Sequence, residues 1–142
     1  MKKQLYFLAP MLLIFASHYS NSADDTRQWV KLPEKMQHHM LSNMRDHLVT
    51  INQILIYMSN DQLDKAADLA EDRLGMTSLE SHGASHMAGF MPEGMKKAGS
   101  RMHHAASQFA LKVEEGELIP AYKALTKVTT ACISCHSAYR IH

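Results

Sequence analysis

The chain of 142 residues is long enough for one domain with a hydrophobic core and too short for two. Its 15 Lys and Arg residues nearly balance its 14 Asp and Glu residues, which argues against a nucleic-acid-binding surface and against an acidic tail for a basic partner. The 11 methionines, the 10 histidines and the low aromatic content favour helices over sheets.

The first residues have the layout of a secretory signal peptide. Two lysines open this segment, an apolar run covers residues 5–16, and small residues follow around Ser22. The run is shorter than the roughly 20 residues that span a bilayer. We therefore expect residues 1–22 to be a signal peptide and residues 23–142 to be the exported domain, which is not inserted in a membrane.

Apolar residues at alternating intervals of three and four predict a first helix after Pro33. They are Leu41, Met44, Leu48, Ile51, Leu55 and Met58. Asn60 and Asp61 supply the cap of a second helix from about Gln62 to Leu74. Gly75 is expected to end this helix in a left-handed conformation. The first half of the domain thus predicts two amphipathic helices joined by a short turn.

Two further helices are expected after the less regular residues 76–91. Pro92 and Glu93 mark the start of the third helix, and Gly116 stops it. Its expected buried side is Met95, Ala98, Met102, Ala105, Ala106, Phe109 and Val113. The fourth helix begins near Pro120, with an expected inward side of Leu118, Tyr122, Leu125, Thr129, Cys132, His136 and Tyr139. Short connections between such helices predict an all-α, antiparallel up-down-up-down four-helix bundle.

Near the end of the chain, Cys132, Cys135 and His136 form a C-x-x-C-H motif, which is the pattern of c-type haem attachment. Two thiols three residues apart on a helix can each bond to one vinyl group of a porphyrin. The imidazole of the next residue can then bind the iron as the proximal ligand. The motif therefore predicts one covalently attached haem c, with these three side chains turned toward the helical interior.

Three other interpretations of the cysteine pair are weaker. A zinc site needs two further ligands, and no second Cys/His pair has a suitable spacing. A thioredoxin-like redox pair needs a βαβ context, which an all-helical pattern lacks. A structural disulfide would close a very small loop and would restrain the unfolded chain little.

The motif continues with Tyr139 and Arg140, and two residues follow. This C-x-x-C-H-x-x-Tyr-Arg ending, together with the helix order, resembles the class II cytochromes c, which include the cytochromes c-prime. The resemblance covers the expected exported domain, and its specific part is the C-terminal motif. It implies a bacterial periplasmic electron carrier rather than an enzyme, with periplasmic redox proteins as partners. A homodimer packed through helices is compatible with it.

The resemblance also implies that the group facing the proximal histidine comes from the first helix. Low-spin relatives place a methionine there, whereas cytochromes c-prime place an apolar side chain and leave the iron open to small gases. Met36, Met40 and Met44 stack at intervals of four on this helix. We predict Met44 as the second iron ligand beside His136, with Met40 as second choice and His47 as a weaker candidate. Binding of NO or CO at an open site is the alternative, with Met44 only packing over the ring.

Other polar groups suggest further roles. Met40 stands where cytochromes c-prime often have an arginine near a haem propionate, so Arg45 or Lys35 would have to pair with that propionate. Five cations could guide an acidic redox partner: Lys96, Lys97, Arg101, Lys123 and Lys127.

Two His/Met clusters leave copper binding as a third hypothesis. They are His38, His39 and Met40 in the first helix, and His82, His86, Met87 and Met91 before the third. The simpler interpretation places these methionines in the core and these histidines on solvated faces.

Overall fold

The computed structural model describes residues 24–142, so the expected signal peptide lies outside the described residues. The elements are β1 (Gln28–Trp29), α1 (Glu34–Ser59), α2 (Leu63–Leu74), the 3₁₀ turn η1 (Met76–Leu79), α3 (Ala84–Ala88), α4 (Glu93–Glu114), α5 (Leu118–Ala138) and β2 (Tyr139–Arg140). Helices make up most of this part of the chain, which confirms the all-α class. None of them, within residues 24–142, is long and apolar enough to cross a membrane.

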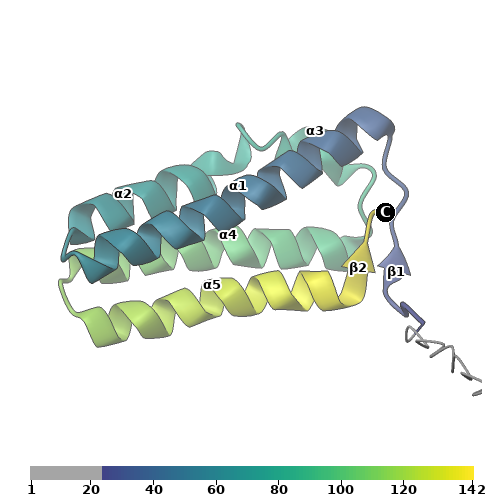
Figure 1. The fold of residues 1–142 in the computed structure, drawn as a ribbon. Helices are drawn as coiled ribbons and strands as arrows, with labels where there is room; N and C mark the ends of the chain where they lie inside the picture. The colour runs from purple at the N-terminus through teal and green to yellow at the C-terminus, as the bar shows by residue number, and fades with distance from the viewer. Residues whose placement is uncertain (1–23) are drawn as a thin grey trace, which may run out of the picture.

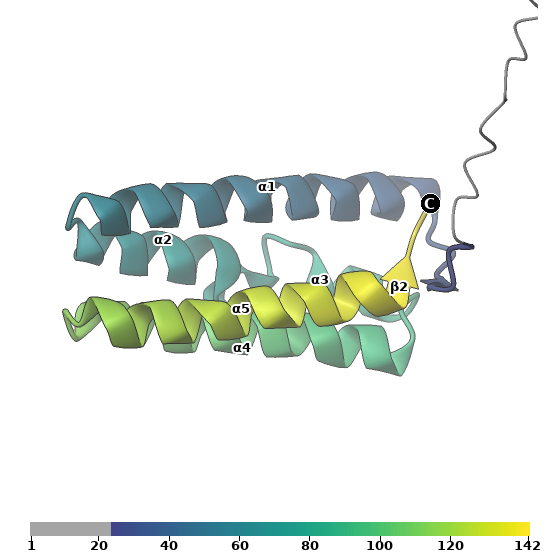
Figure 2. The same cartoon turned by 60° about the horizontal axis from the view of Figure 1, so that its bottom comes forward.

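The four long helices α1, α2, α4 and α5 lie side by side (Figure 1 and Figure 2). α1 contacts α2, α2 contacts α4, and α4 contacts α5. The α1–α2 and α4–α5 turns lie at one end of the molecule (Figure 1). The short helix α3 and the two-residue strands lie at the other end, where the motif at the end of α5 is also found.

The helix boundaries follow from local chemistry. α1 begins after Pro33, whose ring fixes φ near the observed −55° and whose missing N–H is not needed there. Gly116 has φ +79°, a left-handed conformation that suits glycine, and α4 ends two residues before it. Gly75 is instead extended, with φ −72°, so the left-handed expectation is wrong. Glycine is needed there because a Cβ would lie 2.7 Å from the backbone oxygen of Glu71.

The inward face of α4 is nearly as predicted: Ala105 is only partly buried, and His103 and Ala110 are buried in addition. The inward face of α1 differs from the prediction. The buried residues of α1 are Met40, His47, Thr50, Ile54 and Met58. Leu48, which the apolar periodicity placed inside, is 72% exposed, and Leu55 is 41% exposed. The apolar periodicity predicted the neighbouring face of α1, because polar side chains occupy two positions on the face that is buried.

The inward face of α5 also differs from the prediction. Its buried residues are Ala121, Ala124, Leu125, Val128 and Ala131. Leu118 and Tyr122 of the predicted face are exposed. Small alanines at the interface let α5 pack closely against α4, so the large side chains that dominate the sequence pattern lie outside.

Two apolar clusters fill the interior. The larger one surrounds Phe109 and contains mainly alanine, leucine and valine from α2, α4 and α5. The second lies at the end that holds the strands, and methionines dominate it: Met36, Met40, Met44, Met87, Met91 and Met95. Cys132 packs against the first cluster and Cys135 against the second.

Phe109 anchors the larger cluster, with no exposed surface. We expect Phe109→Ala to lower the free energy of unfolding by about 3–5 kcal/mol, since it removes a buried ring and leaves a cavity. Leu111→Ala is the matched control on the same helix, because Leu111 is 54% exposed. Urea denaturation of both variants checks the difference, and equal losses would contradict the placement of Phe109 in the core.

Candidate functional site

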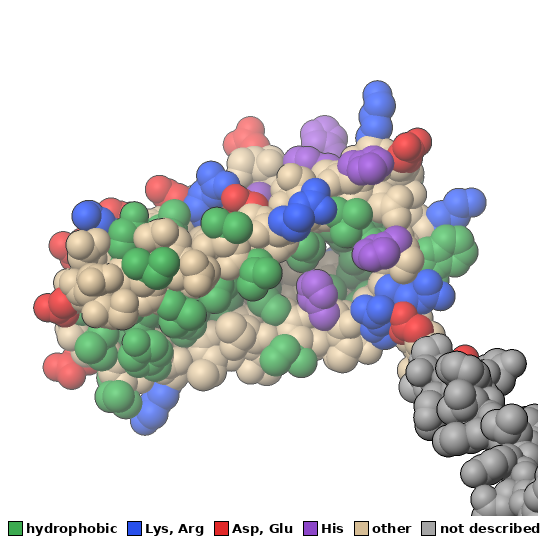
Figure 3. Space-filling view, viewed as in Figure 1, with side chains coloured by type: hydrophobic (Ala, Val, Ile, Leu, Met, Phe, Trp, Pro, Cys, Tyr) green, Lys and Arg blue, Asp and Glu red, His purple; other side chains and the backbone are tan. Residues whose placement is uncertain are grey.

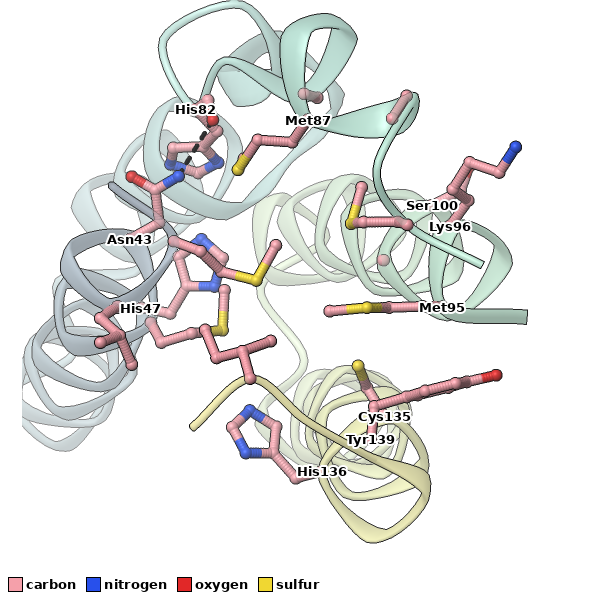
Figure 4. A pocket seen from close by; sticks show the side chains of 18 of the residues that line it. Asn43, His47, His82, Met87, Met95, Lys96, Ser100, Cys135, His136 and Tyr139 are labelled. Carbon is pink, nitrogen blue, oxygen red and sulfur yellow. Dashed lines mark hydrogen bonds between the residues drawn. The ribbon is translucent and has the colours of Figure 1, made fainter. Parts of the chain in front are cut away.

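A cavity of about 450 Å³ opens at the end of the molecule that holds the strands. Its walls come from the first half of α1, from residues 79–91, from the first half of α4 and from the end of α5. Figure 3 shows the molecule hollowed on this face, and Figure 4 shows the side chains that line the cavity. The volume lies within the range of sites that hold small organic ligands.

Part of the C-x-x-C-H motif lines this cavity. Cys135 and His136 project from α5 on the side of the cavity (Figure 4). Cys132 is partly buried just outside the lining, against the larger core. His136 is exposed at the edge of the cavity rather than turned into the core, because the true inward face of α5 passes through Ala131 and Cys135.

Both cysteines are free thiols. Burial raises the pKa of Cys132 and of Cys135, and the neighbouring Cys132 raises the pKa of Cys135 further while Arg101 lowers it. Both thiols therefore keep their protons at neutral pH. Since the thiolate is the nucleophile, they react slowly in the folded chain without help.

The methionines that the sequence singled out on α1 line the same cavity. Met40 is buried in the methionine cluster, and Met44 is partly buried beside it. The fold thus brings Met40 and Met44 to the cavity that Cys135 and His136 also line, although these pairs lie about 90 residues apart in the chain.

The two His/Met clusters of the sequence reach this cavity only in part. Met40, His82, Met87 and Met91 line it. His38 and His86 are exposed, and His39 Nε2 donates a hydrogen bond of 2.9 Å to the backbone oxygen of His82. Copper binding by these clusters stays a prediction.

Three buried histidines form a group that the sequence did not predict. The ring centroid of His47 lies 4.8 Å from that of His82 and 6.0 Å from that of His103, and the latter two rings are 5.5 Å apart. His103 Nδ1 donates to the backbone oxygen of Leu74 at 2.8 Å. Ser78 Oγ lies 3.3 Å from the Nδ1 atoms of His82 and His103. All three rings also line the cavity.

These histidines are neutral at pH 7. Burial, followed by the charges of His82 and His103, lowers the pKa of His47 to about 4. Burial likewise lowers the pKa of His82 and of His103. Within residues 24–142, no group of three or more His, Cys, Asp or Glu side chains is arranged to hold a metal ion. The histidine group is therefore a polar, uncharged end of a cavity that is otherwise lined mainly by methionines.

The cations that line the cavity differ from those expected to pair with a propionate. Arg27, Lys96 and Arg140 line it, whereas Lys35 and Arg45 are exposed and do not. The apolar periodicity of α1 could not point to these arginines, because Arg27 precedes the helix and Arg140 follows α5. Of the five cations proposed for partner docking, Lys96 pairs with Glu93 at 2.7 Å, and the role of all five stays a prediction.

The residues of the cavity fit a haem. Thioethers and the Cys135 thiol offer a soft, mostly apolar lining for a flat macrocycle. Two buried nitrogens in the lining, His47 Nε2 and Arg140 Nε, have no hydrogen-bond partner, so the cavity can take a ligand with polar edges.

The likeness to class II cytochromes c rests on the C-terminal motif and on the order of the helices. Comparison of the chain with protein-family models, with curated proteins and with solved structures finds no match in any of the three. The functional interpretation therefore depends on the residues around the cavity.

Proposed function

We propose that this protein is a bacterial periplasmic c-type cytochrome that carries one haem c and transfers electrons. The observation that carries the proposal is the shared cavity: Cys135 and His136 of the attachment motif line it together with Met40 and Met44 of α1. A thiol, an imidazole and a thioether are the groups that attach and ligate haem in such proteins. Export by way of residues 1–22 would bring the chain to the periplasm, where c-type haem is attached.

The architecture that we propose is an antiparallel up-down-up-down four-helix bundle. Contacts of α1 with α2, of α2 with α4 and of α4 with α5 support it, as do the alternating directions of these helices (Figure 1). In this arrangement, the first helix and the last helix each supply one wall of the cavity.

The residues of the chain have distinct roles in this proposal. Cys132 and Cys135 would form the two thioether bonds to a haem, and His136 and Met44 would supply the imidazole and the thioether that bind its iron. Met87, Met91 and Met95 of the cavity wall exclude water. When bound, the haem supplies an iron that gains and loses one electron at a time. Because a methionine ligand stabilises the ferrous state, Met44 would give a higher reduction potential than a second histidine would.

Replacement of Met44 tests the distal assignment. We expect the purified protein to show a low-spin optical spectrum with a weak far-red iron–sulfur band. Met44→Ala should abolish this band and yield a high-spin form that binds carbon monoxide, because the thioether no longer fills the site. Optical spectra of both redox states, with and without carbon monoxide, check this.

Met40→Ala is the matched control one turn earlier on α1, and it should keep the far-red band. Loss of the band in Met40→Ala but not in Met44→Ala would move the ligand to Met40. A wild-type protein that is already high-spin and binds carbon monoxide would favour the gas-binding alternative. In that case Met44 only packs over the ring.

A further inference from the structure

Two guanidinium groups at the edge of the cavity share one carboxylate. Arg27 Nη2 lies 2.7 Å from Asp25 Oδ2, and Arg27 Nε donates to Asp25 Oδ1 at 2.9 Å. Arg140 Nε lies 3.6 Å from Asp25 Oδ2. The hydrogen bonds to Arg27 keep the pKa of Asp25 at about 2, so this carboxylate is charged at neutral pH. Two guanidinium groups thus share one side-chain carboxylate, and Arg140 Nη1 also donates to an oxygen of His142 at 3.4 Å.

The two arginines are held together by the short strands, although they lie far apart in the sequence. β1 and β2 pair in parallel, with Gln28 opposite Tyr139 and Trp29 opposite Arg140. The Val30 N–H donates to the backbone oxygen of Arg140 at 2.8 Å. Arg27 Nη1 also donates to the backbone oxygen of His136 at 3.3 Å. The strand pair therefore brings the two arginines together, and the Arg27 guanidinium lies beside the last residue of the attachment motif.

One donor of this group is unsatisfied. Arg140 Nε is buried and has no hydrogen-bond partner, since its distance to Asp25 is too long for a hydrogen bond. A buried donor of a charged group without an acceptor costs free energy. The third cation of the lining, Lys96, already has a partner in Glu93 at 2.7 Å. The unsatisfied donor that could take an anion therefore belongs to Arg140, and it lies beside the Arg27–Asp25 pair.

We propose that Arg27 and Arg140 form a carboxylate-binding site that takes a propionate of the haem. This inference rests on the proposed function. Guanidinium groups bind carboxylates with strong, geometrically specific hydrogen bonds. Both arginines line the cavity, whose other walls are largely apolar. Asp25 is the positioning residue: it holds both arginines and competes with the propionate for them.

The ionisation of the propionates tests this site in the complete haem-containing protein. Haem labelled with ¹³C at the propionate carboxyls allows infrared spectroscopy to follow these groups during a pH titration. We expect Arg27→Gln with Arg140→Gln to raise a propionate pKa by about 1–3 units, because the nearby positive charges are lost. Lys123→Gln with Lys127→Gln is the matched control, which removes the same charge from exposed positions on α5 and should shift that pKa far less.

Asp25→Asn predicts a shift of the opposite sign. Removal of the competing carboxylate frees both arginines, so the propionate pKa should fall. If these residues only hold the strands together, the arginine variants and Asp25→Asn should shift the propionate pKa in the same direction. If the double variant does not fold, Arg27→Gln alone and Asp25→Asn decide the question.

Each result separates this inference from the proposed function. A mature protein without Soret absorption would overturn the proposed function, and the carboxylate site would fall with it. A protein that carries haem, but whose propionate pKa is unchanged in the arginine variants, would overturn the carboxylate site alone. An equal shift of the propionate pKa in the lysine control would also overturn the carboxylate site alone. So would arginine variants that weaken the binding of added acetate but leave the labelled propionate unchanged.

Discussion

Replacing Cys132 and Cys135 together with alanine is expected to abolish the covalent attachment of haem. Each thioether bond needs one of the two thiols, and the described chain has no other cysteine. Acid extraction into an organic solvent should remove all haem from this variant and none from the wild type. Intact mass of the denatured chain checks the result directly, because only the wild type should keep the added mass of a tetrapyrrole.

The position of each cysteine gives the single variants different expected effects. Cys135 lines the cavity, whereas Cys132 packs against the alanine-rich core beside it. Either single variant should keep one thioether bond, and Cys132→Ala should also loosen the neighbouring core slightly. Ser134→Ala is the matched control: Ser134 lies between the cysteines and is exposed, so full attachment is expected. Covalent haem in the double variant would contradict the assignment of the motif.

Those parts of the fold that depend on local chemistry could be predicted from the sequence. Pro33 restricts its own φ and Gly116 permits a left-handed conformation, so the sequence predicts the start of α1 and the end of α4. The inward face of α4 was also found, because its buried positions are nearly all apolar. The resemblance to class II cytochromes c predicts a site shared by His136 and Met44; both side chains line one cavity, and their ligand roles stay a prediction.

The sequence could not predict inward helix faces that carry polar or small side chains. His47 and Thr50 take inward positions on α1, and a hydrophobic periodicity treats both as surface residues. On α5 the inward residues are mostly alanines, which a pattern based on large side chains overlooks. These two exceptions explain why the predicted faces of α1 and α5 lie beside the true ones.

The sequence also could not predict contacts between segments that lie far apart in the chain. The pairing of β1 with β2 joins two-residue strands more than 100 residues apart, which are too short to show an alternating pattern. The histidine group joins α1, the loop that holds His82, and α4. The sequence places these three histidines in different segments, and only the tertiary packing reveals that they are neighbours.

This histidine group leads to a second large effect, a loss of stability in mild acid. His47 ionises in the unfolded chain near its ordinary pKa of 6.5 and in the folded chain only near 4. Between these values the unfolded state binds more protons, so the free energy of unfolding must fall as the pH falls. Above about pH 7 both states are neutral at this site, and the stability is unaffected.

The size of the effect follows from the shift of His47. One pKa unit corresponds to about 1.4 kcal/mol, so this residue alone should remove about 3 kcal/mol between pH 7 and pH 4. His82 and His103 act in the same direction, because burial lowers their pKa values too. Of the charged neighbours, Asp46 opposes the shift of His47 and Arg73 adds to it. The sum is a large share of the stability of a domain of this size.

Urea denaturation at a series of pH values measures the loss, and variants assign it. His47→Leu should remove about 3 kcal/mol of the pH dependence, because leucine cannot take up a proton. The matched control replaces the exposed His38 and His86 with glutamine and should keep the full dependence. Every variant keeps the same acidic residues, so the difference between the wild-type and His47→Leu curves is assigned to the buried imidazole. If His47→Leu loses as much stability in acid as the wild type does, His47 is not neutral and buried in solution. The polar end of the cavity would then have to be assigned to other groups.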